Sequence, residues 1–143
     1  HVQTPDQDRV VHHRGSWAAA FSLSSSRMGR YEWGNNENNL GWYQGDGMVQ
    51  FYLAGDRSGF DGNYWATSDP YHLPGVTNGT QSRTSGAGGV GTGIPGATQT
   101  WAGGVGWLGD VGTVGMDHKA YDGNLTAKKS WFFLSDMVIA LGS

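Results

Sequence analysis

Residues 16–24 alternate between larger apolar side chains and small or polar ones, and this alternation constrains the fold more than any other feature. One set of alternate positions holds Trp17, Ala19, Phe21 and Leu23. A period of two places such a set on one face of a β-strand, and no apolar stripe at helical spacing runs through the stretch. Residues 48–53 alternate in the same way. The chain is therefore predicted to fold around short strands, each with one buried face.

Other short stretches extend this pattern over much of the 143-residue chain. Ser135 and Asp136 separate the two most apolar of them and are predicted to form a hairpin turn. We predict further strands at residues 9–14, 101–107, 111–118, 129–134 and 137–141. The prediction is an all-β, antiparallel fold of about seven or eight strands without a helix, in one domain spanning residues 1–143.

The remaining segments are predicted to be loops. Residues 1–8 are polar and are expected to be irregular, and residues 81–100 are rich in Gly, Ser and Thr, as in a surface excursion. Residues 64–77 contain two prolines, which favours a fixed loop or an edge segment. Trp65 and Tyr71 in this segment either line a groove or pin the loop to the core, and pinning is the preferred interpretation.

Residues 31–48, which read YEWGNNENNLGWYQGDGM, follow neither period. Runs of Asn and Gly avoid regular structure, because Asn bonds its own backbone and Gly supplies positive φ. Aromatic rings stack on the apolar faces of sugars, while amides and carboxylates bond the hydroxyl groups. Glu32, Trp33 and Trp42 could therefore belong to a sugar-binding groove. The alternative is a turn-rich connection with its aromatic side chains in the core.

Charge and composition argue against several classes of partner. The net charge of −3 gives no reason to expect nucleic acid, and an anionic ligand would need a local basic patch. Arg27 and Arg30 flank the loop, either as solvated charges or as contacts for such a ligand. The chain has no Cys, which excludes disulfides and is compatible with a secreted protein. No apolar run reaches membrane-spanning length, so no membrane partner is expected.

The histidines and acids do not form a recognisable metal motif. His12 and His13 are adjacent, so on a strand they face opposite sides, and His72 and His118 are isolated. The acids between residues 46 and 69 lack the spacing of an EF-hand. We expect neither a metal ion nor a cofactor.

A series of motifs occurs in the order found in one enzyme family. Residues 31–48 combine Asn-x-Glu-Asn with Gly-Trp-Tyr-x-Gly-Asp-Gly-Met, residues 64–77 read YWATSDPYHLPGVT, and residues 128–132 read KKSWF. Residues 8–12, 26–28 and 140–143 also fit. The chain resembles polysaccharide lyase family 8, which contains the hyaluronate, chondroitin AC and xanthan lyases, over nearly its whole length.

The resemblance implies that residues 1–143 begin an antiparallel β-sandwich domain that follows an α/α-toroid domain in the family, with the catalytic cleft between the two. The family cleaves uronic-acid polysaccharides such as hyaluronan or chondroitin by β-elimination. A Tyr moves the proton there, supported by His, Asn and Arg from the toroid, which this chain lacks. The implied partners are an anionic polysaccharide and the remainder of the same enzyme, in an extracellular location.

The family's Glu-x-x-Asn spacing matches two residues of this chain. The resemblance implies that Glu32 completes the catalytic tetrad and that Asn35 binds the substrate, beside Trp33 and Trp42. Glu37, Asn38 and Asp46 are expected to shape the loop. The chain alone is expected to be catalytically inert, with its sheet edge covered by other polypeptide or by self-association.

Two other functions remain open at this stage. A free-standing carbohydrate-binding module would also be all-β and rich in Trp, and would bind uronate polysaccharides strongly without a partner. A purely structural β domain would keep its aromatic side chains in the core and would not respond to saccharides.

Overall fold

The computed structural model describes residues 1–86, 96–121 and 123–143. These described residues contain eight β-strands, two 3₁₀ turns and one four-residue helix, α1 (Tyr64–Thr67). The 3₁₀ turns are η1 (Pro5–Gln7) and η2 (Ser58–Phe60). The strands are β1 (Val2–Thr4), β2 (Arg9–His13), β3 (Trp17–Ser22), β4 (Met48–Leu53), β5 (Ala102–Trp107), β6 (Val111–Lys119), β7 (Thr126–Phe133) and β8 (Val138–Gly142).

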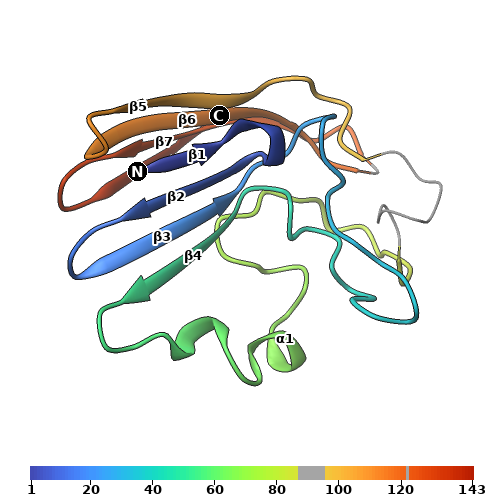
Figure 1. Cartoon of the computed structure of the whole chain (residues 1–143). Coiled ribbons are helices and arrows are strands. Elements are labelled where there is room, and N and C mark those ends of the chain that lie inside the picture. Colours follow the sequence, from blue (N-terminus) through green and yellow to red (C-terminus); the bar gives the residue numbers. More distant parts are fainter. Residues whose placement is uncertain (87–95, 122) are drawn as a thin grey trace.

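The strands form two antiparallel sheets, each with its strands in sequence order. One sheet has the order β1-β2-β3-β4 and the other β5-β6-β7-β8. The two sheets lie one over the other as layers (Figure 1). This confirms the predicted all-β antiparallel sandwich and the strands placed by the alternating pattern. The hairpin at Ser135 and Asp136 is confirmed as well, because the Leu134 N–H donates to the Met137 carbonyl.

Phe21 on β3 links the two sheets through the main core. Its ring meets Phe133 of the second sheet edge to face, with 5.0 Å between ring centroids, and Trp131 at 5.6 Å. Both partners lie on β7, on the face that the period of two turns inward. All three side chains are almost completely buried, as the alternation of residues 16–24 requires.

Two sequence expectations were wrong. Residues 1–8 were expected to be irregular, but Val2–Thr4 pairs with β2 as a short edge strand. Three residues are too few for an alternation to be seen in the sequence. No helix was expected, but Tyr64–Thr67 makes one helical turn after Asn63, inside the segment predicted as a fixed loop. The rest of that segment is irregular, as predicted.

The excursion predicted at residues 81–100 falls partly outside the described structure. Its described ends, residues 81–86 and 96–100, are irregular. Residues 87–95 lie outside the described residues, so that part of the prediction stays a prediction. In the described parts of the chain, no helix is long and apolar enough to cross a membrane.

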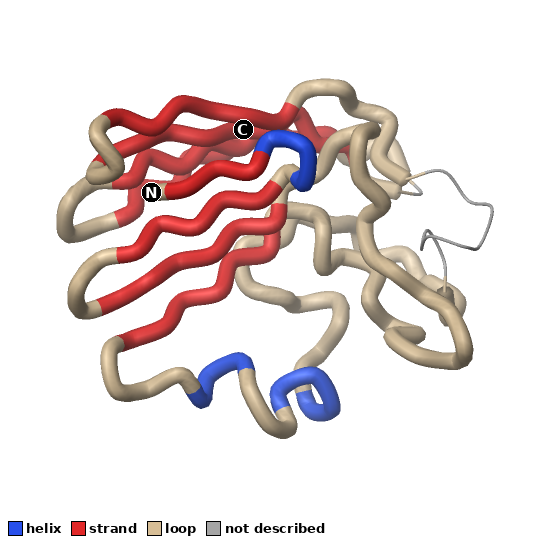
Figure 2. Tube along the Cα trace, viewed as in Figure 1, coloured by secondary structure: helices blue, strands red, loops and turns tan. Residues whose placement is uncertain are grey.

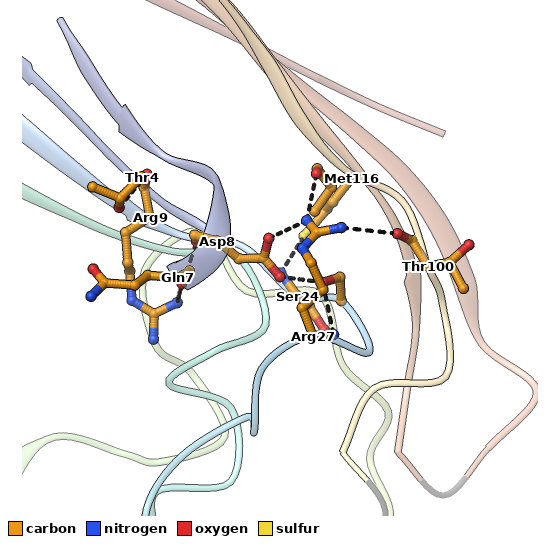
Figure 3. Close-up of polar contacts among 10 residues, drawn as sticks. Thr4, Gln7, Asp8, Arg9, Ser24, Arg27, Thr100 and Met116 are labelled. Atoms are coloured by element: carbon orange, nitrogen blue, oxygen red, sulfur yellow. Dashed lines mark hydrogen bonds and ion pairs between the residues drawn. The ribbon is translucent and has the colours of Figure 1, made fainter.

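The β3–β4 loop lies at the end of the sandwich opposite the short turns, whereas the β4–β5 connection leaves β4 at the short-turn end and runs back below that strand (Figure 2). At the loop end Arg27 joins the two sheets. Its guanidinium pairs with the buried Asp8 carboxylate and donates to the carbonyls of Thr100 and, at 2.8 Å, Ala102 at the start of β5 (Figure 3). The Ser25 hydroxyl donates to the other carboxylate oxygen of Asp8. This network holds the loop end closed where the candidate site is built.

Candidate functional site

The loop between β3 and β4 is closed at its base by a buried ion pair. Arg30 Nη1 lies 2.5 Å from both carboxylate oxygens of Asp46, and both side chains are almost completely buried. Arg30 Nη2 also donates to the Lys119 carbonyl at 2.8 Å, which ties the base to the second sheet. A buried charge pair is strongly destabilised if one partner is removed, so this base fixes where residues 31–45 leave the sandwich.

Asparagines shape the outer part of the loop. Asn35, Asn36 and Asn38 adopt positive φ angles of 49°, 62° and 53°, a conformation that Asn tolerates better than most residues. Asn38 also donates from its amide to the Glu32 carbonyl at 2.8 Å and exchanges two hydrogen bonds of 3.1 Å with the Gln44 amide. The loop-shaping roles expected for Asn38 and Asp46 are therefore confirmed.

The inner side of the loop is a second apolar cluster. Tyr31, Trp42, Tyr43, Met48 and Leu73 are buried there. The Trp42 ring is 3% exposed, packs 5.1 Å from Tyr71 between ring centroids, and donates its indole N–H to the Thr84 carbonyl at 3.0 Å. Its faces are covered, so in this structure Trp42 pins the loop. That placement differs from the sugar-stacking role expected for it.

Glu32 and Asn35, in the same loop, are exposed to solvent. Among the described residues, no hydrogen bond or ion pair engages the Glu32 carboxylate or the Asn35 side-chain amide. Both groups are presented by a backbone that the Asn38 and Asp46 contacts hold in place. A free carboxylate on a braced loop can bind a cation or a donor group brought by other polypeptide, and a free amide can bond sugar hydroxyls.

Trp33 lies partly against the apolar cluster and partly in solvent. Its indole N–H donates to the Asn39 side-chain oxygen at 2.7 Å, and its ring packs against the apolar cluster while staying partly exposed. Gly86, at φ +76°, lies so close to the ring that a Cβ there would sit 2.7 Å from an indole carbon. The Trp33 ring is therefore held by a hydrogen bond and by close backbone packing, next to Glu32 in the sequence.

The flanking arginines belong to the framework. Arg27 pairs with Asp8 and Arg30 with Asp46, an internal role that neither of the two interpretations included, and the buried Arg30 is not the solvated charge that one of them expected. Arg83 was not singled out in the sequence, where a Gly-, Ser- and Thr-rich segment gives no signal. Its guanidinium carbon lies 4.9 Å from the ring centre of Tyr43 and 4.1 Å from that of Tyr121.

Trp65 and Tyr71, which were expected either to line a groove or to pin their loop to the core, lie in different environments. Tyr71 pins its loop, because its hydroxyl accepts the Arg83 backbone N–H at 2.9 Å and its ring contacts Trp42 and Tyr43. Trp65, on α1, is 48% exposed. The preferred interpretation of pinning therefore holds for Tyr71 and is wrong for Trp65, whose ring packs edge to face with the neighbouring Tyr64.

Two titratable groups, the partly buried Lys129 and the buried His118, lie behind the loop base. Lys129 donates to the Gly75 carbonyl, and burial lowers the pKa of its ammonium, against the opposing effect of Asp46. His118 is buried, contacts the Thr77 carbonyl through Nε2 at 2.8 Å, and has a pKa lowered chiefly by burial. Both anchor the segment after α1 to the second sheet. In the parts of the chain that the structure describes, no three His, Asp or Glu side chains gather as metal ligands.

Comparison with known proteins identifies the family. The model of the super-sandwich domain of polysaccharide lyase family 8 matches residues 1–143. The chain is 45% identical, over 95% of its length, to the polysaccharide lyase 8 family protein HylA of Enterococcus faecalis, and 41% identical, also over 95%, to a hyaluronate lyase of Thermasporomyces composti. It covers 10% and 17% of those two proteins, so it spans a small part of its relatives.

Solved structures agree with the sequence comparison. A Streptomyces coelicolor A3 chondroitin AC lyase, solved in complex with chondroitin sulphate, is 40% identical with a TM-score of 0.87, and 94% of this chain covers 18% of it. A Paenibacillus xanthan lyase is also 40% identical, with a TM-score of 0.81 over 94% of this chain and 12% of its own. The chain therefore belongs to polysaccharide lyase family 8 and has the fold of its super-sandwich domain.

Proposed function

We propose that this chain is the part of an extracellular polysaccharide lyase that presents Glu32 and Asn35 to the catalytic cleft. The observation that carries the proposal is the exposed, unengaged Glu32 carboxylate, with Asn35 three residues on, on a loop braced by the buried Arg30–Asp46 pair. Relatives named as hyaluronate, chondroitin AC and xanthan lyases support a uronic-acid polysaccharide as substrate.

The reaction is β-elimination. A base removes the proton at C5 of the uronate, the electron pair forms the C4–C5 double bond, and the C4–O bond breaks, with a proton delivered to the leaving oxygen. The proton next to a carboxylate is weakly acidic, so the enzyme must stabilise the charge that develops on that carboxylate. It also needs positioned groups that take and give the proton.

Within this scheme the residues of this chain position and bind. Glu32 accepts charge-assisted hydrogen bonds from an Arg or Tyr of the toroid domain and so orients the group that handles the proton. Asn35 bonds a substrate hydroxyl. We assign the proton transfer itself to polypeptide outside this chain, because the family resemblance implies that the Tyr, His and Arg that perform it come from the toroid domain.

The test compares the isolated 143-residue chain with the full polypeptide that carries it. Ultraviolet absorbance of the unsaturated uronate follows turnover on hyaluronan, chondroitin and xanthan in turn. We expect the full polypeptide to form this product from at least one polymer and the isolated chain to form none. Turnover by the isolated chain, or none by the full polypeptide on all three, contradicts the proposal. Tight polysaccharide binding by the isolated chain would instead support a carbohydrate-binding module.

A further inference from the structure

A cavity of about 210 Å³ lies beside the loop, between its Asn38–Gln44 part and the segment after α1. Its lining includes the half-exposed Trp65, the amides of Asn38, Asn39 and Gln44, and the Ser68 hydroxyl, with Leu40, Pro70 and Leu73 as apolar neighbours. Aromatic, amide and hydroxyl groups around a small hollow are the chemistry that recognises a sugar ring. Neither Glu32 nor Asn35 lines this cavity, so the proposed function gives the cavity no role.

The lining contains no charged side chain. A uronate carboxylate buried without a cation would lose its hydration with little in return, so the cavity disfavours it. A neutral sugar has no such cost, because its hydroxyls need only neutral donors and acceptors. The larger groove at the other end of the sandwich has the opposite character, since Arg14 and Arg57 line it.

Hydrogen-bonding capacity remains in the lining after the internal contacts are counted. Asn38 uses both amide hydrogens on the Glu32 carbonyl and on Gln44, and Gln44 gives one hydrogen back to Asn38. One Gln44 N–H, a lone pair on each of the two amide oxygens and the Ser68 hydroxyl are left. These groups suffice for about two sugar hydroxyls, with Trp65 as the stacking surface.

Asn38 connects the cavity to the candidate site. Asn38 lines the cavity and holds the Glu32 carbonyl at 2.8 Å, so a ligand in the cavity rests against the loop that presents Glu32. Resting on the proposed function, we propose that this cavity is a subsite for the neutral sugar unit that neighbours the uronate in the polymer, with the Trp65 ring stacking on that unit.

The test follows the indole N–H signals of the chain by NMR, with the Trp65 signal identified by its loss in Trp65→Ala. Three probes are titrated: a hyaluronan tetrasaccharide, chitotetraose, which carries no carboxylate, and tetragalacturonate, which carries only uronates. Trp107 on β5, 67% exposed, is the matched reference ring. We expect the Trp65 signal to shift with the first two probes and not with the third, while the Trp107 signal stays unchanged.

A second measurement uses the full polypeptide. We expect Trp65→Ala to raise KM about 10-fold, Trp65→Phe to restore most of it, and Trp107→Ala to have no effect. No Trp65 shift with either hexosamine-containing probe, or a larger shift with tetragalacturonate, overturns the neutral subsite. An unchanged KM in Trp65→Ala overturns it too, while normal turnover by that variant leaves the proposed function standing. The proposed function fails separately, if the wild-type polypeptide forms no unsaturated uronate.

Discussion

Arg30 and Asp46 join the two ends of the loop that carries the candidate site. One guanidinium nitrogen lies 2.5 Å from both carboxylate oxygens, and both side chains are almost completely buried. The residues between them hold Glu32 and Asn35 outward and Trp42 inward. The pair therefore holds the ends of an irregular, Asn-rich segment in place, so that its exposed residues form a defined surface.

Removing one partner of this pair should destabilise the folded chain. Asp46→Ala leaves a buried guanidinium without its counter-ion, and we expect the free energy of unfolding to fall by about 3–5 kcal/mol. Urea unfolding followed by tryptophan fluorescence measures the change. Arg14→Ala, which breaks the exposed pair with Asp110, is the control and should cost less than about 1 kcal/mol. Equal losses in the two variants would contradict the bracing role of the buried pair.

Trp42 and Trp65 should respond differently to truncation. Trp42 is buried among aromatic rings, so Trp42→Ala is expected to lower the free energy of unfolding by about 3–5 kcal/mol. Trp65 is half exposed, and Trp65→Ala should cost less than about 1 kcal/mol. Thermal unfolding of both variants checks this. A mild effect in Trp42→Ala would show that its ring is not the anchor that its contacts suggest.

These two tryptophans show where sequence patterns stop being informative. The strands could be predicted because alternation reports a local property, namely which face of a strand is buried. Trp42 and Trp65 lie in segments without a period, so their burial depends on partners far along the chain. Trp42 is covered by Tyr71 and capped by the Thr84 carbonyl, and no local pattern encodes those contacts.

In the candidate site, too, some residues could be predicted from the sequence and others could not. Glu32 and Asn35 could be named from a motif, and their exposure is consistent with that assignment, which stays a prediction. The framework roles of Arg27 and Arg30 could not be chosen from the sequence, because an Arg beside an anionic-ligand loop and an Arg in an ion pair look alike. Only the three-dimensional pairing with Asp8 and Asp46 separates the two cases.

His118 should make the fold sensitive to mild acid. Its folded-state pKa is lowered by burial, so the folded chain keeps the ring neutral where the unfolded chain already binds a proton. Stability from this group is present above the ordinary His pKa of about 6.5 and is lost as the pH falls below it. His12, also buried with a lowered pKa, acts in the same direction.

Unfolding by urea at pH 7.5 and pH 5.5 tests this prediction. We expect the free energy of unfolding to be lower at pH 5.5, and His118→Gln to reduce the difference between the two pH values. His72→Gln is the control, since that ring is exposed and pairs with the exposed Asp69. If His118→Gln leaves the difference unchanged, the buried ring is not responsible for it.

Asn35 can be tested without disturbing its backbone. Its φ of 49° is comfortable for Gly, so Asn35→Gly removes the amide while keeping the turn. We expect the KM of the full polypeptide to rise about 10-fold, in line with the loss of one hydrogen bond to a substrate hydroxyl, with unfolding changed by less than about 0.5 kcal/mol. Asn36→Gly, at φ 62° in the same turn, is the matched control and should leave KM unchanged. Equal KM values in the two variants would remove Asn35 from the site.

The central claim is that Glu32 takes part in β-elimination, and one comparison tests it most directly. Glu32→Gln and Glu37→Gln each neutralise one exposed carboxylate of the same loop. Formation of unsaturated uronate by the full polypeptide is measured for both, alongside urea unfolding. Glu32→Gln is predicted to lower kcat by roughly 100-fold or more, with the free energy of unfolding changed by less than about 0.5 kcal/mol, and Glu37→Gln is predicted to retain wild-type turnover. Wild-type turnover in Glu32→Gln, or an equal loss in both variants, would contradict the account.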